Sequence, residues 1–416
     1  MAKQWSWRDH RPWELIPAVA ITVVAGAFAW RALRDPSGRD FATYYLGADR
    51  AWRGVSPWRD PYWLQTPGTI LAVGPFTAVF GQSAAAWWLT IVNFFLTLGL
   101  AAAALWYLVP RVARWFAWTL VVALTAWGPL AGTFWWKQFN LIALAMVVAG
   151  FALARRRPWI AGVLIGVSIA IKPLALLLPL FFLLRRETRR AGAAAVVAAA
   201  GWTLGGLLVV ARAAGEPLDP FGYYRLFDDR TVEEFACNRV NTSPTGMACR
   251  LMGSTEHFGV IRVVVLLGLA VLVALAIARV LGTGATSMAV LAWACLLSPM
   301  VSPLEWPHYG VMMAPMFLYL AVVAWQHSRR LDLWFGIVVA YALSQVVWNP
   351  AQSAVAFFSG TSESLEDVYR TFAVSAAAQF VLVAVALAAP TRPTGAPLLG
   401  GGPVLAEAHV DDERHP

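Results

Sequence analysis

The sequence predicts an all-α, polytopic membrane protein with about twelve spanning helices. Of its 416 residues, 59% are hydrophobic and 13% are charged, whereas soluble domains are roughly 45–50% apolar and about 25% charged. Apolar runs that approach the roughly 20 residues of a spanning helix recur from Glu14 to Ala389. We therefore expect one membrane-embedded domain over residues 1–389, and the first apolar run is interpreted as a retained helix.

Short clusters of arginine separate the apolar runs and predict their orientation, because basic loops face the cytoplasm. These clusters lie at 8–11, 111–114, 155–157, 185–190 and 329–330. The spans expected between them are 15–30, 84–108, 115–136, 141–154, 159–171, 173–184, 191–211, 260–280, 288–300, 309–325, 331–348 and 372–389.

Two long segments, 31–83 and 212–259, then lie on the outer face and carry short interfacial helices. Within the first of them, the apolar stretch 66–80 could form an interfacial or a re-entrant helix. Residues 390–416 are rich in Gly and Pro, which predicts a disordered cytoplasmic tail.

Lys172 interrupts an apolar region and is the most informative cation of the sequence. A lysine at the centre of a spanning helix costs about 2.5–3.5 kcal/mol on insertion scales. The runs on either side of Lys172-Pro173 are short for spans, and both outer ends carry arginines, so we predict a helical hairpin with Lys172 at its apex. One long kinked helix is the alternative. A lipid phosphate could compensate the ammonium, and an internal carboxylate or snorkelling is the other possibility.

Asp40 follows the first span, with Tyr44 close behind it. A carboxylate at this position could act as a general base on a lipid-borne hydroxyl. On local grounds a pair with Arg39, or a cap on a helix starting near Phe41, is the better-supported interpretation. Asp49 and other charged residues in the same loop have similar local surroundings.

Polar residues also gather at three other outward connections. Lys137, Gln138 and Asn140 could form only a tight turn, or could hold a phosphate or sugar hydroxyls. Glu305 and His308 could pair with each other, or His308 could donate to a leaving phosphate.

The second outer loop carries Asn241, Arg250, Cys237 and Cys249. Arg250 is suited to bidentate phosphate binding, although a salt bridge to an acidic residue of the same loop is an equal alternative. The two cysteines could pair or stay free.

Several short motifs, in this order, resemble glycosyltransferase family 87, membrane enzymes of the GT-C type that use polyprenyl-phosphate sugars. They are DFATYY, ADRAWRGVSPW, KQFNLIALA, AGVLIGVSIAIKPLALLLPLFFLLRR, NTSPTGMACRL, LSPMVSPLEWPHY and PMFLYL. The chain departs from the family's Tyr-Pro-Pro run, where it reads Gln65-Thr66-Pro67-Gly68.

The resemblance implies a GT-C-like bundle in a bacterial cytoplasmic membrane with its active site on the extracytoplasmic face. It implies inverting transfer of a sugar, mannose before arabinofuranose, from a polyprenyl-phosphate donor to a lipid or glycan acceptor. Asp40 would be the base, and the substrate would be bound by residues from all the polar connections. These are Lys172, His308, Arg250, Gln138, Asn140, Tyr44, Asn241 and Glu305.

Other function classes fit the sequence less well. The net charge of +9 is explained by membrane topology, so we expect no nucleic-acid partner. No metal-ligand spacing joins Asp40, Glu305 and His308, and we expect no metal and no cofactor. A lipid or small-molecule transporter would also have about a dozen helices, but should concentrate its charges near the bilayer midplane rather than in outer loops. A scaffold for cell-envelope assembly would need larger soluble loops.

Overall fold

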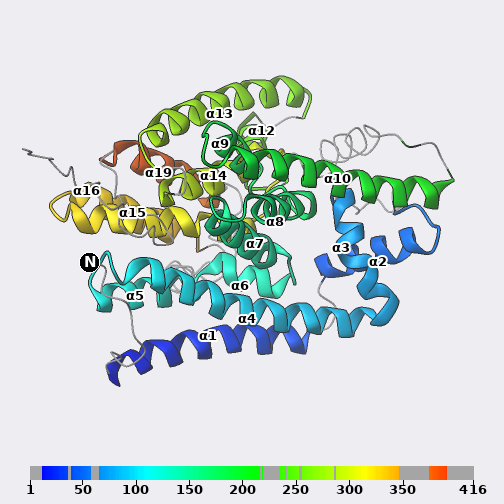
Figure 1. Cartoon of the computed structure of the whole chain (residues 1–416), viewed down its shortest axis with the longest axis horizontal. Helices are drawn as coiled ribbons and strands as arrows, with labels where there is room; N and C mark the ends of the chain where they lie inside the picture. Colours follow the sequence, from blue (N-terminus) through cyan, green and yellow to red (C-terminus); the bar gives the residue numbers. More distant parts are fainter. Residues whose placement is uncertain are drawn as a thin grey trace, which may run out of the picture.

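The computed structural model describes residues 12–35, 39–57, 65–215, 241–252, 255–284, 287–345 and 374–390, with isolated positions between 218 and 238. Over these ranges every regular element is a helix (Figure 1). The elements are η2 (Pro12–Glu14), α1 (Leu15–Arg34), α2 (Arg39–Trp52), α3 (Pro67–Val79), α4 (Gln82–Leu108), α5 (Arg114–Thr125), α6 (Gly128–Trp135), α7 (Asn140–Leu153), α8 (Pro158–Ile171), α9 (Leu178–Leu183), α10 (Arg189–Ala214), α12 (Pro244–Met252), α13 (Phe258–Leu281), α14 (Met288–Val301), η5 (Pro307–Met313), α15 (Ala314–Gln326), α16 (Leu331–Leu343) and α19 (Val374–Ala388). The predicted tail, 390–416, lies outside the described residues except for Pro390.

Five helical units of the described chain are long and apolar enough to cross a membrane: α1 with η2, α4, α10, α13, and η5 with α15. The bent pair α5–α6 makes a sixth if it is counted as one span. The chain is thus an all-helical membrane protein, but the expected count of about twelve spans is not confirmed. Helices α7, α8, α14, α16 and α19 were expected as spans and are apolar helices of only 10–17 residues.

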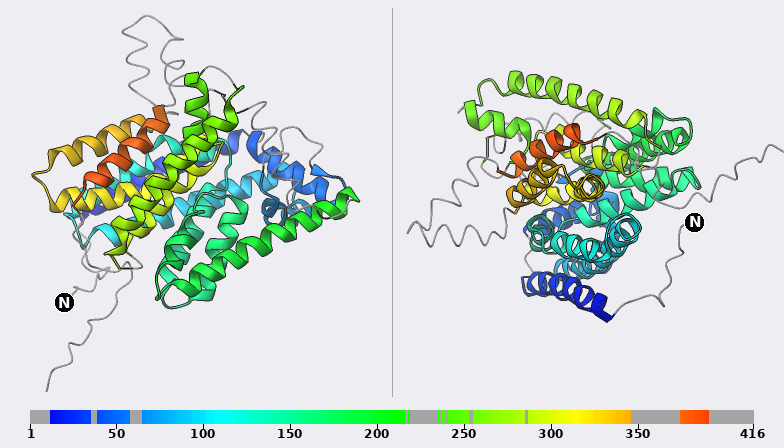
Figure 2. Two further views of the ribbon diagram at one scale, coloured as in Figure 1. Left: turned by 90° about the horizontal axis from the view of Figure 1, so that it is seen from above. Right: turned by 90° about the vertical axis from the view of Figure 1, so that its left-hand side faces the viewer.

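Helices α1 and α13 lie on opposite sides of the bundle (Figures 1 and 2). Only 22% and 11% of their most apolar windows are buried by the rest of the protein. Exposed Val and Leu side chains line α13, including Val260, Val264 and Leu267. Lipid tails are the natural cover for such faces.

The predicted hairpin around Lys172 is confirmed by the way α8 packs on α10. A Cβ at Gly162 would meet Ala194, and a Cβ at Gly166 would meet Ala198. Contacts that advance together along both helices mean that α8 and α10 run in the same direction, so the chain returns between them. The arginine-flanked starts of α8 and α10 therefore share one end of the bundle, and Lys172 lies at the other.

The return segment is less helical than expected. A helix was predicted over 173–184, but α9 begins only at Leu178. Lys172 has extended backbone angles, with φ −146° and ψ 121°, as is common before a proline. The hydroxyl of Ser298 accepts the N–H of Leu177 at 3.0 Å and holds the turn against α14.

Two other predicted helices are also broken. The span expected over 115–136 is α5 followed by α6, bent by 40°. Pro129 in the first turn of α6 explains the break, because proline has no N–H and its ring clashes with the carbonyl four residues earlier, here that of Thr125, the last residue of α5. The span expected over 309–325 begins as the 3-10 helix η5 and becomes α15 at Ala314. Helix α6 and the 3-10 helix η5 both contact the side chain of Asn140, through Thr133 and His308.

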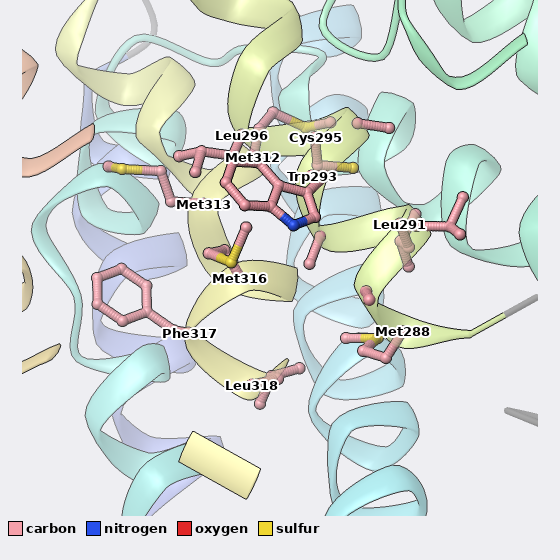
Figure 3. Close-up of a cluster of buried hydrophobic side chains, with 14 of the residues drawn as sticks. Met288, Leu291, Trp293, Cys295, Leu296, Met312, Met313, Met316, Phe317 and Leu318 are labelled. Carbon is pink, nitrogen blue, oxygen red and sulfur yellow. The ribbon is translucent and has the colours of Figure 1, made fainter. Parts of the chain in front are cut away.

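The apolar core lies mainly between α14 and α15. Figure 3 shows Trp293 among Met312, Met316 and Leu296, and all four are buried. The short helix α3, predicted as interfacial or re-entrant, packs on α2, α8 and α10. Core and α3 together fix the end of α8 that carries Lys172.

Candidate active site

The turn between α6 and α7 projects two amide side chains into the bundle. Lys137 adopts a left-handed backbone conformation, φ 49°, which reverses the chain. Its own ammonium donates to the carbonyl of Asp35 just after α1, a favourable place for a cation at a helix C-terminus. Lys137 is therefore a structural residue of a tight turn, while Gln138 and Asn140 are left to face inward.

Lys172 meets these two amides at the end of α8. Its side chain is 3% exposed. The ammonium donates to Gln138 Oε1 and, at 2.8 Å, to Asn140 Oδ1. It also lies 4.2 Å from the ring centre of Tyr309, a cation–π distance. The Lys172 ammonium, predicted at a hairpin apex, is thus surrounded by neutral groups. Two amide oxygens accept its hydrogen bonds, and a tyrosine ring lies beside it.

Thr66, just before α3, and Thr69, in the first turn of α3, hold the end of α8 just before Lys172. Thr66 Oγ1 donates to the carbonyls of Ala170 and Ile171, at 2.5 and 2.8 Å, and Thr69 Oγ1 donates to Ile171 at 3.1 Å. The last carbonyls of a helix have no partner within the helix. These hydroxyls satisfy them and fix the direction in which Lys172 leaves α8.

Helix α2 brings Asp40 to the same place. Phe41, Tyr44, Tyr45 and Ala48 are buried along one face of α2, at the spacing of an amphipathic helix. Asp40 lies in the first turn of α2, beside this face. Its position excludes the predicted N-cap role, because the helix already begins one residue earlier. The side chain of Arg39, the other expected partner, lies outside the described residues.

Gln138 joins Asp40 to Lys172 through the two ends of its side-chain amide. Its Nε2 donates to Asp40 Oδ2, while its Oε1 accepts from Lys172 and, at 2.8 Å, from the Tyr44 hydroxyl. Each end of the amide is therefore committed. Gln138 and Tyr44 hold the Asp40 carboxyl and the Lys172 ammonium in a fixed arrangement, and their role in binding substrate stays a prediction.

Burial raises the pKa of the Asp40 carboxyl from 3.8 to about 6, and the nearby Lys172 ammonium offsets part of that rise. A carboxylate with a pKa close to neutral is a stronger proton acceptor than an ordinary surface aspartate. Asp40 therefore combines the geometry and the electrostatics of a general base.

The segment around His308 contacts the Lys172 site through Asn140. Asn140 Nδ2 donates to the His308 carbonyl at 2.9 Å, so Asn140 contacts both Lys172 and η5. The His308 ring is buried, and its Nε2 has no hydrogen-bond partner within the described part of the chain. No contact supports the expected pair between His308 and Glu305, whose carboxylate instead accepts from Gln379 of α19.

Asn241 connects the segment before α12 to the residues that precede η5. The Oδ1 of Asn241 accepts the N–H of Glu305 at 3.1 Å, and its Nδ2 donates to the Pro303 carbonyl at 3.0 Å. Thr242 N–H donates to the Glu305 carbonyl at 2.7 Å. Asn241 therefore positions the backbone of Glu305, and its role in binding substrate stays a prediction.

Arg250 supports the same loop. Its Nη1 donates to the carbonyls of Asn238 and Asn241, at 2.6 and 2.7 Å. Beside it, Cys237 and Cys249 form a disulfide, which resolves the open choice between paired and free thiols. Among the residues that the structure describes, no contact joins Arg250 to Lys172, so a shared phosphate pocket stays a prediction. The acidic loop residues weighed as its partners, such as Asp228 and Glu233, lie outside the described ranges.

Comparison with known proteins places this geometry in a family. A model of glycosyltransferase family 87 matches residues 63–303, more than half of the chain. The chain belongs to glycosyltransferase family 87. The resemblance seen in the sequence motifs is thereby confirmed, and the protein is a membrane glycosyltransferase.

Three curated relatives agree with this family 87 membership. A polyprenol-phosphate-mannose-dependent alpha-(1-2)-phosphatidylinositol mannoside mannosyltransferase of Mycobacterium tuberculosis is 29% identical over 354 residues, 79% of this chain and 80% of that protein. The protein of the same name from Mycolicibacterium smegmatis is 27% identical over 53% of this chain and 50% of its own. An alpha-(1->3)-arabinofuranosyltransferase of Corynebacterium glutamicum is 28% identical over 38% and 40%, respectively. No solved structure matches the chain.

Sequence reasoning missed several residues of this family 87 site. Tyr309, Gln379, Thr66 and Thr69 contact the predicted residues but were not singled out. The two threonines gave no usable signal, because their hydroxyls bond the end of α8, about a hundred residues further along the chain. Gln379 gave a weak one, as a lone amide in an apolar helix.

Within the described residues, no three His, Cys, Asp or Glu side chains gather as potential metal ligands. The expectation that transfer needs no metal and no cofactor stays a prediction.

Proposed function

We propose that this family 87 enzyme transfers mannose, with inversion, from a polyprenyl-phosphate donor to a lipid or glycan acceptor. The observation that carries the proposal is the Asp40–Gln138–Lys172 arrangement. It holds a carboxyl of raised pKa and a buried ammonium at the two ends of one amide. The mannose and the donor come from the names of the mycobacterial relatives, which the chain matches over most of its length.

In the proposed reaction the acceptor hydroxyl oxygen attacks C1 of the sugar, and Asp40 takes the hydroxyl proton. The bond between C1 and the phosphate oxygen breaks on the opposite face, so the leaving group is polyprenyl phosphate. Lys172 stabilises the negative charge that grows on this phosphate. Because the leaving phosphate is already a good anion, it needs little further protonation, and no metal is invoked.

Gln138 separates the two charged groups in this scheme. Without it, the ammonium would pair directly with the carboxylate, which would lower the basicity of Asp40 and neutralise the charge meant for the phosphate. An amide between them lets each charge face the substrate. His308, with its unpartnered Nε2, supplies a further hydrogen bond to the phosphate or the sugar.

An apolar cavity of about 220 Å³ supports a substrate with a long hydrocarbon chain. Leu130, Leu141 and Val311 line one part of it, adjacent in sequence to the polar site, and Tyr107 and Met288 line another. Its walls suit a prenyl or acyl chain whose phosphate or glycan head lies beside Lys172.

The proposal includes a location. The enzyme would lie in a bacterial cytoplasmic membrane as a single domain over residues 1–389, with its site on the extracytoplasmic face. Helix α2, the α6–α7 turn and the Lys172 apex lie at one end of the bundle, and the arginine-flanked starts of α8 and α10 lie at the opposite end. This arrangement supports the location, because basic helix ends face the cytoplasm. The disulfide fits an oxidising compartment.

The test is transfer by the purified chain in bilayers, supplied separately with labelled polyprenyl-phosphate mannose and polyprenyl-phosphate arabinofuranose. We expect labelled glycolipid from the mannose donor. Product from the arabinofuranose donor alone would favour arabinofuranosyl transfer, the activity named for the corynebacterial relative. Movement of the donor across the bilayer without any product would support a transporter instead.

A further inference from the structure

A second carboxyl–amide pair lies beside the proposed reaction centre. Glu305 precedes η5, and Gln379 projects from α19, the last described helix. Their side chains are 1% and 2% exposed. Gln379 Nε2 donates to Glu305 Oε1, which joins two segments distant in the sequence. A charged group and an amide are rarely buried this deeply unless they are paired or serve a ligand.

The pair is only half satisfied. Glu305 Oε2 and Gln379 Oε1 have no hydrogen-bond partner anywhere in the described ranges. A buried acceptor without a donor is unfavourable, and native proteins leave few of them. Asn241 and Thr242 hold the Glu305 backbone, and Gln379 holds one oxygen of its side-chain carboxyl group. Two polar groups without partners therefore await a molecule that brings hydrogen-bonding groups of its own.

The position of the pair indicates which molecule that is. Tyr309 connects the two polar groups: its ring centre lies 4.2 Å from the Lys172 ammonium, and it follows Glu305 by four residues, at the start of η5. A substrate at Asp40 and Lys172 therefore extends toward Glu305. Neighbouring hydroxyls of a sugar are donors at a spacing that a carboxylate and an amide oxygen can accept together.

We propose that Glu305 and Gln379 form a subsite for the vicinal hydroxyls of a sugar, with Gln379 as its specificity-determining residue. This subsite rests on the proposed function. Gln379 lies outside the stretch that matches the family model, residues 63–303. The C-terminal helix α19 would then add sugar selection to the centre formed by Asp40, Gln138 and Lys172.

The experiment measures KM and kcat for the purified full-length chain in bilayers. The variants are Gln379→Leu, which removes both polar atoms, and the isosteric Glu305→Gln, which replaces the carboxyl group by an amide. Phe380→Leu is the matched control, because Phe380 lies beside Gln379 on α19 and is part of the apolar packing. Two arms separate the two sugars involved: donor hydrolysis without acceptor, and transfer to a sugar-bearing lipid at saturating donor.

We expect Gln379→Leu to raise one KM by about tenfold or more, with a smaller change in kcat, because a buried hydrogen-bonding partner is lost. A change in the hydrolysis arm places the donor sugar in the subsite, and a change confined to the transfer arm places the acceptor sugar there. Phe380→Leu should leave both KM values near those of the wild type.

Unchanged KM values in both arms, in a Gln379→Leu chain with the wild-type melting temperature, would overturn the subsite. If Gln379→Leu does not fold, Glu305→Gln decides in the same way. A wild-type chain that neither hydrolyses nor transfers from any polyprenyl-phosphate sugar would refute the proposed function, and the subsite with it.

Discussion

Helix α2 carries two aspartates with opposite surroundings. Asp49 pairs at 2.8 Å with Arg53, one turn further along, and the arginine side chain is largely exposed to solvent. Asp40, at the other end of α2, faces a buried glutamine and lysine. Surface pairs such as the first contribute about 0–1 kcal/mol, whereas burial gives Asp40 a pKa of about 6. The same side chain is an ordinary surface ion in one place and a candidate base in the other.

The two lysines next to the α6–α7 turn repeat this difference. Lys137 is buried because its ammonium meets the carbonyl after α1, a task that any well-placed cation can do. Lys172 is buried against side chains that also hold Asp40. The lesson is that burial alone does not mark a catalytic charge. What marks it is the connection, through a shared partner, to a second charge.

The largest effect should come from Asp40→Asn compared with Asp49→Asn. We expect Asp40→Asn to lower transfer by about a hundredfold to ten-thousandfold, the usual contribution of a general base. Asp49→Asn should retain activity within about twofold, because it loses only a surface pair. Initial rates with a labelled donor measure both. Equal activity of the two variants, with equal melting temperatures, would remove Asp40 from the mechanism.

The next effect separates the two lysines. Lys172→Met should lower kcat by about a hundredfold, since a preorganised charge on the leaving phosphate is lost. Lys137→Met should instead lower the melting temperature and leave kcat per folded molecule nearly unchanged, because it loses only a helix-end contact. Kinetics together with thermal unfolding in detergent distinguish the two. A Lys137→Met chain that folds well but fails in chemistry would erase the distinction.

The pH profile gives a smaller effect of definite sign. A base must be deprotonated to accept a proton, so a raised pKa of Asp40 raises the pH below which activity is lost. We expect kcat/KM to fall as the pH drops through about 6. Lys172 opposes this rise, so the residual activity of Lys172→Met should fall off at a higher pH than that of the wild type. Asp49→Asn should not move the profile. An acid limb near pH 4 would indicate a solvent-exposed carboxylate instead.

Much of the fold was predictable because apolar runs and arginine clusters respond to the bilayer directly. The starts of α4, α8 and α13 lie within two residues of their predicted positions. The hairpin at Lys172 was also predictable, from a proline and a cation between two short runs. Breaks at Trp127 and before Ala314 were not, because a proline that ends a helix and one that opens the next look alike in a sequence.

The main residues of the site were predictable from the sequence, but their hydrogen-bond partners were not. Asp40, Gln138, Asn140 and Lys172 were all expected, and the structure joins them. Their division into base, cation and positioning amides depends on which end of an amide faces which charge, and that is decided by packing between distant helices. Gln379 was missed because a polar residue in an apolar helix gives no sign of its partner until α19 is placed.

The smallest effect concerns the support beneath Lys172. Thr66→Val keeps the shape of the side chain but removes the hydroxyl that caps α8, so we expect a loss of about 1 kcal/mol of stability. Thr77→Val is the matched control, since its hydroxyl bonds only within α3, to Gly74. If the cap also aims Lys172, Thr66→Val lowers kcat severalfold at temperatures where the chain stays folded, and Thr77→Val does not. Equal kinetics in the two variants would mean that the amides alone hold the ammonium, and that the first outer loop contributes stability without shaping the site.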